Sequence, residues 1–260
     1  MALEPTTGEI EVAGITLRYL EAGDGPEILF LHGASGAGWN PLLDRLSADW
    51  RVIAPEHPGF GLSPIPEWMM STGDLAFFYL DLLQALNLHH LHLVGHDVGG
   101  WIAAEMAIRN TGWLSSLTLI APAGVAHPQA PFGDVLLWST EEFARRQFRD
   151  PKRADDWLQV QAALGMDIVL QNRAGLARLG SNAGLSNPQL SYWLHRIDIP
   201  TLLIWGKDDE VIPFACHEAF MREIPHAELF PLALAGHALP IECAWEISRR
   251  LTQFFQGARG

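Results

Sequence analysis

The segment that most constrains the fold is 93–101, which reads LVGHDVGGW. An apolar run ends here in a turn with glycines two positions before and two positions after Asp97, and helical periodicity follows. A side chain on such a sharp strand-to-helix turn takes strained backbone angles and crowds its neighbours, so glycine is required on both sides. The turn also places backbone N–H groups where they can hold an anion. An aspartate that opens a helix is also a common N-cap, so this segment alone does not decide the function.

Short apolar runs bounded by turn residues recur along the chain and alternate with segments of helical periodicity. Apolar runs without polar alternation are typical of strands buried on both faces, as in a parallel sheet. Strands that alternate with helices predict an α/β fold, with helices flanking a mostly parallel central sheet. We expect a hairpin at 9–20, strands in EILFLHG, RVIAPEHPG, LHLVGHD, LTLIAPAG, TLLIWGKDD and AELFPLA, and helices at 73–86, 99–110, 216–223 and 241–256.

The alternation of strand and helix is interrupted once, between Pro122 and Ile197. We therefore expect a core made of residues 1–121 and 198–260, with residues 122–197 inserted after the sixth strand as a helical cap, or lid. Aromatic side chains in this insert indicate an apolar face that packs on the core. Within the insert, the segments with helical periodicity are 140–149, 153–164, 166–179 and 188–196.

Composition excludes several classes of partner. Seventeen Lys and Arg against 30 Asp and Glu give a net charge of -13, which repels the phosphates of nucleic acid. A chain of this size needs no disulfide, so Cys216 and Cys243 are expected to be thiols of a cytoplasmic protein. The first residues lack the basic and apolar regions of a signal peptide, and no stretch reaches the roughly 20 apolar residues that span a bilayer. We expect a small-molecule substrate and no membrane partner; the sequence is compatible with a homodimer.

Two later segments place polar groups directly after strands. The loop 205–213, WGKDDEVIP, carries adjacent carboxylates, and the loop 235–240, AGHALP, carries His237. In an open parallel sheet, groups at the carboxyl ends of strands converge on one crevice. The order of elbow residue, acid and histidine along the chain is one of the known orders of a catalytic triad. These segments therefore favour a catalytic site over a simple helix cap at the elbow.

With these motifs, the chain resembles the α/β-hydrolase superfamily over nearly its whole length. HGASG at 32–36 stands where that family has its oxyanion-hole loop, and PEHPGFGLS at 55–63 is similar to its D-x-P-G-x-G-x-S turn, with Glu56 in place of aspartate. The sequence as a whole is most similar to the meta-cleavage product hydrolases. These are lid-bearing carbon–carbon bond hydrolases of aromatic ring cleavage, and they carry serine at the elbow. Aspartate at the elbow is instead the signature of the epoxide hydrolase and dehalogenase branch.

The resemblance implies a role for each reactive group. Asp97 would attack a saturated carbon and form a covalent alkyl ester, and His237 would activate the water that hydrolyses the ester. The backbone N–H groups of Ala34 and Val98 would form the oxyanion hole. Asp209 would orient the histidine. This chemistry implies no cofactor and no metal.

The spacing of the acid loop favours Asp209 over its neighbour. In the family pattern G-x-x-D-x-x-x-P, the acid lies three residues after the glycine and four before the proline, which fits Gly206, Asp209 and Pro213. The adjacent Asp208 remains the alternative.

The branches with an aspartate nucleophile differ in what holds the leaving group. Haloalkane dehalogenases usually hold the halide with an Asn after the HG pair and a Trp after the nucleophile, but Ala34 and Val98 occupy those positions. Haloacetate dehalogenases use arginines just after the nucleophile, and the first arginine here is Arg109. Epoxide hydrolases use acids from the lid, commonly tyrosines and occasionally a histidine with a tyrosine. The insert offers Tyr192, His127 and His195 for that role.

We therefore expect a hydrolase with an aspartate nucleophile, similar to epoxide hydrolases and acting on a small hydrophobic or aromatic substrate. The alternative is an ester or carbon–carbon bond hydrolase whose elbow serine has become aspartate, naturally or by mutation. A haloalkane or haloacid dehalogenase and a non-catalytic ligand-binding homologue are further alternatives. The expected substrate-binding residues are Ser35, Gly36, His96, Trp138, Trp157, Tyr192 and Leu239.

Overall fold

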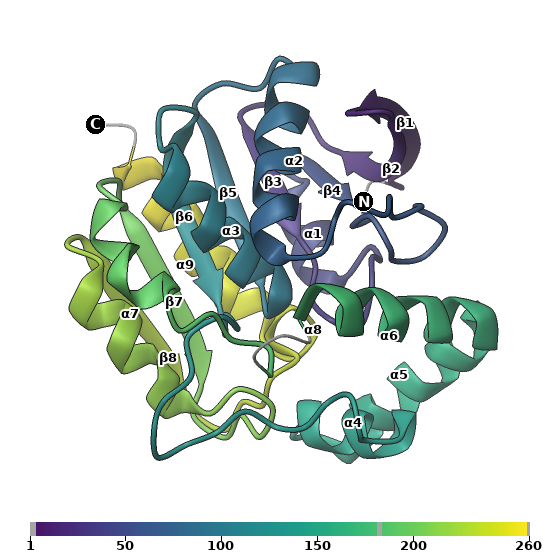
Figure 1. The fold of residues 1–260 in the computed structure, drawn as a ribbon. Coiled ribbons are helices and arrows are strands. Elements are labelled where there is room, and N and C mark those ends of the chain that lie inside the picture. The colour runs from purple at the N-terminus through teal and green to yellow at the C-terminus, as the bar shows by residue number, and fades with distance from the viewer. Residues whose placement is uncertain (1–3, 181–183, 259–260) are drawn as a thin grey trace.

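The computed structural model describes residues 4–180 and 184–258. An eight-stranded sheet lies at its centre, with strand order β1-β2-β4-β3-β5-β6-β7-β8 (Figure 1). The pairs that involve β1 and β2 are antiparallel, and all other neighbours are parallel. The predicted fold class, a mostly parallel α/β sheet, is thus confirmed. The strands span Thr6–Val12 (β1), Ile15–Ala22 (β2), Glu27–Leu31 (β3), Arg51–Pro55 (β4), Leu91–His96 (β5), Leu114–Ile120 (β6), Thr201–Gly206 (β7) and Ala227–Leu232 (β8).

The central strands are buried on both faces, which explains their unbroken apolar sequence. Every residue of β7 is buried, and β5 is buried from its start as far as Gly95. At the edge of the sheet, β1 is partly exposed and carries polar residues. The buried strands fix the position of the residues that follow them, and the candidate site lies at this carboxyl edge.

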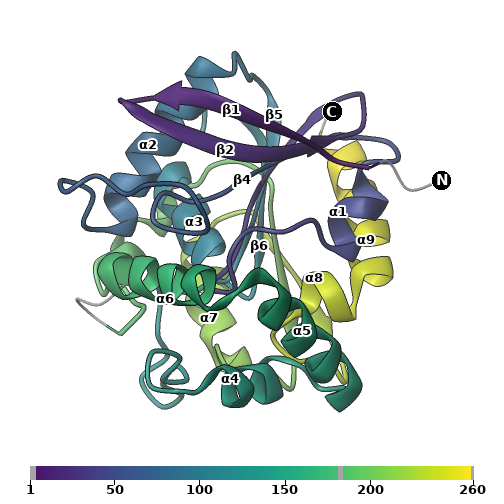
Figure 2. The same cartoon turned by 90° about the vertical axis from the view of Figure 1, so that its right-hand side faces the viewer.

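Helices cover both faces of the sheet. Figure 2 shows α1 and α9 on one side of the sheet and α2 and α3 on the other. On the first side, the ring of Phe255 in α9 packs edge-on against Trp50 and is stacked on His92 of β5. The helices outside the insertion span Pro41–Leu46 (α1), Thr72–Ala85 (α2), Val98–Arg109 (α3), His217–Glu223 (α7), Leu239–Glu242 (α8) and Ala244–Gly257 (α9).

A helical insertion joins β6 to β7, as expected for the sixth strand. It contains α4 (Thr140–Gln147), α5 (Pro151–Leu164) and α6 (Met166–Gly180). Figures 1 and 2 place these helices together beyond one end of the sheet. Side chains cap two of these helices: Ser139 caps α4 by accepting from Glu142 N–H, and Asp150 caps α5 by accepting from Lys152 N–H.

Two elements differ from the sequence prediction. Residues 188–196, expected as a helix, form two short 3₁₀ turns, Leu190–Tyr192 (η2) and Leu194–Arg196 (η3). The N–H groups of this segment bond to carbonyls three residues earlier, so no α-helical turn is completed. Conversely, α1 was not predicted from the sequence. The side chain of Asn40 accepts hydrogen bonds from Leu42 N–H and Leu43 N–H and caps this short helix.

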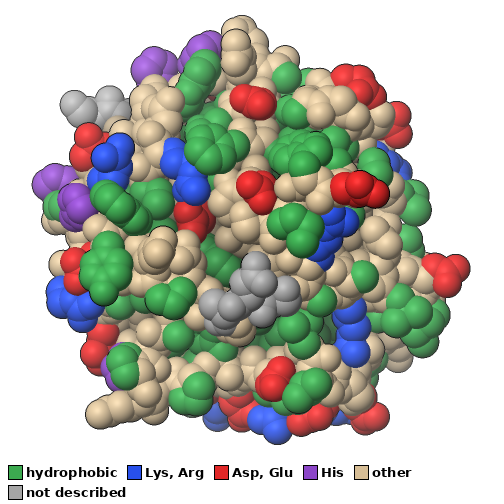
Figure 3. All heavy atoms as spheres, in the orientation of Figure 1, with side chains coloured by type: hydrophobic (Ala, Val, Ile, Leu, Met, Phe, Trp, Pro, Cys, Tyr) green, Lys and Arg blue, Asp and Glu red, His purple; other side chains and the backbone are tan. Residues whose placement is uncertain are grey.

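Charged side chains of the insertion lie in pairs on its surface. Arg145 pairs with Asp155 at 2.6 Å, and Arg146 pairs with Glu142 at 3.1 Å. Figure 3 shows acidic and basic side chains side by side along the lower edge of the molecule, where Figure 1 places α4. No helix in the described part of the chain is long and apolar enough to cross a membrane.

Candidate active site

Asp97 occupies the sharp turn between β5 and α3. Its φ of 54° and ψ of -121° are the strained angles expected of an elbow residue. The flanking glycines are needed for space: a Cβ on Gly95 would lie 2.3 Å from the Gly99 carbonyl oxygen, and one on Gly99 would lie 2.1 Å from the Leu31 carbonyl oxygen. The side chain of Asp97 makes no capping hydrogen bond to α3, so the helix-cap interpretation of this residue is wrong.

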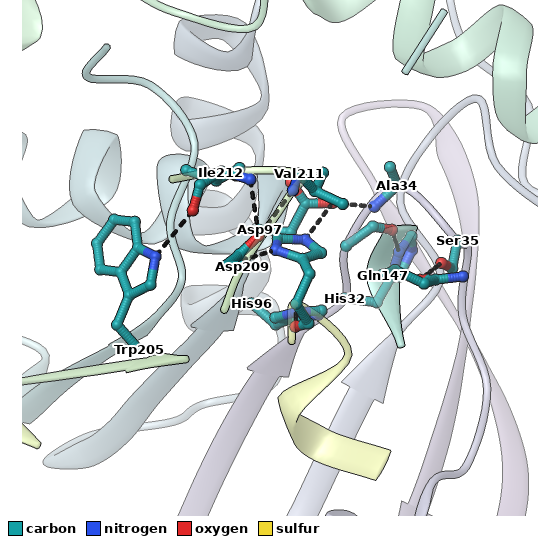
Figure 4. A network of polar contacts seen from close by, with 12 residues as sticks. His32, Ala34, Ser35, His96, Asp97, Gln147, Trp205, Asp209, Val211 and Ile212 are labelled. Carbon is teal, nitrogen blue, oxygen red and sulfur yellow. Dashed lines mark hydrogen bonds and ion pairs between the residues drawn. The ribbon is translucent and has the colours of Figure 1, made fainter. Parts of the chain in front are cut away.

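The carboxylate of Asp97 is buried and faces two groups from distant parts of the chain. Its Oδ2 accepts a hydrogen bond of 2.7 Å from Ala34 N–H, and the same oxygen lies 3.8 Å from Nε2 of His237. Figure 4 shows Ala34 and Asp97 joined by this bond. Val98, the other residue expected to offer an oxyanion-hole N–H, is buried at the first position of α3. The carboxylate therefore lies between a backbone donor and an imidazole.

The structure places Asp209, and not Asp208, against His237. Oδ1 of Asp209 accepts hydrogen bonds from Val211 N–H and Ile212 N–H, and Oδ2 accepts from His237 Nδ1 at 2.8 Å (Figure 4). These three bonds hold the carboxylate in one orientation. Asp208 instead points to the surface, where it pairs with Arg149 at 2.6 Å.

His237 is held by the end of α4. The N–H groups of His237 and Ala238 donate to the carbonyl of Gln147 at 2.9 and 2.8 Å, which also satisfies the free carbonyl at the end of that helix. Nε2 of His237 is buried and has no hydrogen-bond partner among the described residues, only the ion-pair distance to Asp97. This nitrogen is thus free to bond to a water or substrate that enters the site.

Burial and charge act in opposite directions on the titrating groups. Burial alone would lower the pKa of His237, but the carboxylates of Asp209 and Asp97 outweigh it and raise that pKa to about 10. Burial would raise the pKa of Asp97, but the facing His237 outweighs it and lowers the value. Burial lowers the pKa of His32 and of His96 to about 4. At neutral pH an imidazolium therefore lies between two carboxylates, with two neutral histidines beside them.

The raised pKa of His237 predicts a pH-dependent stability. Because its folded pKa of about 10 exceeds its ordinary value of 6.5, the stabilisation is fully present below pH 6.5 and is lost as the pH rises through 10. Asp97→Asn removes one of the two charges that hold the proton. The difference in unfolding free energy between wild type and Asp97→Asn should therefore shrink between those two pH values. Urea unfolding at a series of pH values measures it, and a constant difference would contradict this coupling.

The Ala34 loop rests on a buried histidine pair. His57 N–H donates to Nε2 of His32 at 3.0 Å, and His57 Nε2 donates to the carbonyl of His32 at 2.9 Å. The hydroxyl of Tyr79 donates to Nδ1 of His57. The rings of the two histidines stack at 3.7 Å between centroids. This network fixes the loop that presents Ala34 N–H, so His32 and His57 are positioning residues and not reactive groups.

A cavity of about 340 Å³ opens beside the reactive groups. It reaches His96, the residue before Asp97, and Ala238, the residue after His237. Of the expected substrate-binding residues, Ser35, Gly36, His96 and Trp157 line it.

The other expected substrate-binding residues lie elsewhere. Tyr192 lies in η2 and is 74% exposed. The segment formed by η2 and η3 packs against α7 and α3, on the outside of the core. Trp138 packs under the guanidinium of Arg146 at 4.7 Å and does not line the cavity. Leu239, the first residue of α8, is fully buried and does not line the cavity either.

The histidines considered as lid acids also lie away from the cavity. His127 faces Glu218 at 3.7 Å, and His195 lies in η3 beside Trp193. Neither lines the cavity. None of the three ring-opening acids considered from the sequence is therefore in position.

Part of the cavity wall could not be recognised from the sequence. Gln147, Gln161, Trp39 and Asn40 line the cavity, yet none belongs to a recognisable motif. The one signal available was a glutamine at the end of an otherwise charged amphipathic segment. Gln147 is 2% exposed, which is unusual for a glutamine.

The described residues offer no metal site: no group of three or more His, Cys, Asp or Glu side chains is placed to hold an ion. Cys216 and Cys243 are free, and burial raises the pKa of each thiol to about 11. At neutral pH neither is a nucleophile.

Comparison with known proteins shows the same architecture. The sequence profile of the "Alpha/beta hydrolase family" matches residues 28–246. The 2-hydroxymuconate semialdehyde hydrolase of Pseudomonas sp. (strain CF600) is 26% identical, covering 96% of this chain and 94% of that protein. The pimeloyl-[acyl-carrier protein] methyl ester esterase of Vibrio atlanticus (strain LGP32) is 26% identical, over 86% and 92%. The structure of 2-hydroxy-6-oxo-6-phenylhexa-2,4-dienoate hydrolase from Rhodococcus sp. strain RHA1 superposes with a TM-score of 0.85 at 20% identity, over 98% and 99% of the two chains.

Proposed function

The chain belongs to the alpha/beta hydrolase family, and we propose that it is a hydrolase in which Asp97 takes the place of the family's serine and forms a covalent ester with its substrate. The observation that carries this proposal is the hydrogen bond from Ala34 N–H to Oδ2 of Asp97. In a serine enzyme, that donor would bind the carbonyl oxygen of the substrate. Here it already binds an oxygen of the nucleophile.

This geometry suits an enzyme that makes its own ester. Oδ1 of Asp97 would attack a saturated carbon, forming a C–O bond while the bond to the leaving group breaks and its electron pair departs with that group. The carbonyl oxygen of the new ester is Oδ2, which already lies at Ala34 N–H. When water attacks the ester carbon, the developing oxyanion is held without any rearrangement.

The change in charge on Asp97 would switch the role of His237. While Asp97 is ionised, two carboxylates hold the proton on the imidazole. Esterification makes Asp97 neutral, so only Asp209 remains and the pKa of His237 falls. Once His237 has given its proton to the departing group or to solvent, Nε2 can accept one from the attacking water and then donate it to the oxygen that leaves with the product.

The relatives favour a second candidate, hydrolysis of an ester or of a carbon–carbon bond. The name of the Vibrio protein describes a methyl ester esterase, and the name of the Pseudomonas protein describes a hydrolase of a semialdehyde. In that reaction, a substrate carbonyl would have to displace Oδ2 of Asp97 from Ala34 N–H. The subclass of epoxide hydrolases with a lid tyrosine gains no support either, since Tyr192 lies outside the cavity. We therefore propose the aspartyl ester without assigning an epoxide as the electrophile.

Asp97→Ser tests the relationship to the serine enzymes. The serine hydroxyl would lie near Nε2 of His237, and Ala34 N–H would be free for a substrate carbonyl. The variant should hydrolyse p-nitrophenyl butyrate at least about 100-fold faster than wild type, an increase typical of a restored nucleophile and oxyanion hole. Asp97→Ala, which frees the same donor but adds no nucleophile, is the matched control. Equal rates for the serine and alanine variants would show that the site cannot support acyl transfer.

A further inference from the structure

The cavity beside the reactive groups contains no ionised side chain. Among the described residues that line it, none is Lys, Arg, Asp or Glu. Its histidines, His32 and His96, are neutral because burial lowers the pKa of each to about 4. A carboxylate in this cavity would lose its hydration without gaining a counter-ion. The neighbouring pair of carboxylates around one imidazolium would repel it further.

Aromatic and aliphatic groups make up most of the remaining wall. The rings of Trp39 and Trp157 and the side chains of Val160, Leu164 and Ile241 line the cavity. Trp157 is fixed by an edge-on contact with Phe143 at 5.9 Å between centroids. Flat apolar walls of this kind favour an aromatic molecule.

One donor in this wall lacks a partner. Nε2 of Gln147 is buried and has no hydrogen-bond partner among the described residues. A buried amide N–H without a partner is costly, so a native protein that retains one needs an explanation. Since Gln147 lines the cavity, an acceptor atom on a bound molecule would satisfy it.

Gln147 also joins the insertion to the site. Its carbonyl accepts from His237 N–H and Ala238 N–H, and its Oε1 accepts from the hydroxyl of Ser35 at 3.3 Å. Figure 4 shows Gln147 and Ser35 next to each other on the Ala34 side of Asp97. The amide is therefore held at a fixed place relative to the reactive groups, as a substrate-positioning group must be.

We propose that the cavity binds an uncharged aromatic substrate through an oxygen that accepts a hydrogen bond from Nε2 of Gln147. This names the substrate class of the proposed function and rests on it. It also separates this chain from the Rhodococcus hydrolase, whose named substrate is a dienoate, and thus a carboxylate.

Binding of three unreactive probes tests the proposal without any turnover, so failure of the covalent mechanism would not affect the result. The probes are 4-fluoroacetophenone, 4-fluoro-α-methylstyrene and 4-fluorobenzoate, and fluorine NMR titration of wild type gives each dissociation constant. The first two share one shape but only the ketone has an acceptor; the benzoate adds a charge. The ketone should bind at least about tenfold more tightly than the benzoate. Equal or tighter binding of the benzoate, or no binding of either neutral probe, would overturn the assignment.

Gln147→Met then isolates the hydrogen bond. Methionine keeps the length of the side chain but has no donor, so the ketone should bind roughly three- to tenfold more weakly, the usual effect of one hydrogen bond, while the styrene should not weaken. Gln161→Met makes the same change at the other glutamine of the cavity and should leave the ratio of the two dissociation constants unchanged. A parallel loss for both probes would mean that Gln147 only shapes the cavity. If Gln161→Met changed this ratio and Gln147→Met did not, the donor would be Gln161 and the assignment to Gln147 would be wrong.

Discussion

In the His237→Gln variant, Asp97 should react with an electrophile and remain alkylated. Esterification needs only the carboxylate, whereas hydrolysis of the ester needs Nε2 of His237 to take a proton from water. Removing a general base of this kind lowers turnover by about 10² to 10⁴-fold. The covalent ester should therefore accumulate to one equivalent per chain.

Mass spectrometry provides the measurement. The variant is incubated with styrene oxide, phenyl glycidyl ether or (2-bromoethyl)benzene, and the intact mass and the modified peptide are determined. We expect the mass of one adduct, assigned to Asp97 by fragmentation. Asp97→Asn in the same His237→Gln background is the control, and it should show no adduct. An adduct at any other residue, with wild type turning over the same compound, would exclude Asp97 as the nucleophile.

Asp97→Asn by itself should abolish turnover while preserving the fold. The amide can still accept the hydrogen bond from Ala34 N–H through Oδ1, but it has no charge with which to attack carbon. Loss of a covalent nucleophile typically costs more than about 10³-fold in turnover. Turnover is measured with an electrophile that alkylates His237→Gln. Circular dichroism shows whether Asp97→Asn is folded.

Asp208→Asn is the matched control for this change. It makes the same substitution in the acid loop, at a carboxylate that pairs with Arg149 on the surface and does not touch the reactive groups. It should retain turnover within about twofold, since exposed ion pairs contribute little. If Asp97→Asn kept similar activity, the elbow carboxylate would have no covalent role.

Much of the site could be predicted because its groups lie in strong local patterns. The elbow glycines follow from the close approach of β5, α3 and β3, and this constraint is visible in the sequence. Asp97, Asp209 and His237 follow β5, β7 and β8 of one parallel sheet, so their meeting at its carboxyl edge follows from topology. The preference for Asp209 over Asp208 came from spacing, and the structure gives the reason in the two N–H groups that fix its carboxylate.

The cavity wall could not be predicted to the same extent. Which face of the insertion meets the core depends on packing between α4, α5 and α6, and periodicity does not determine it. The sequence therefore does not reveal that the segment of Tyr192 forms 3₁₀ turns, which leave this side chain exposed and outside the cavity. Gln147 could not be recognised from the sequence, because its place in the site comes from contacts with Ser35 and the His237 loop, which are distant in sequence.

One turnover of substrate in water enriched in oxygen-18 tests most directly whether an Asp97 ester forms. If water attacks the carbonyl carbon of an Asp97 ester, the oxygen of the product comes from the enzyme and the label enters the carboxylate. We expect unlabelled product and a labelled Asp97 peptide after the first turnover, with no label at Asp97 in His237→Gln. Label found in the product and not in Asp97 would contradict the covalent mechanism.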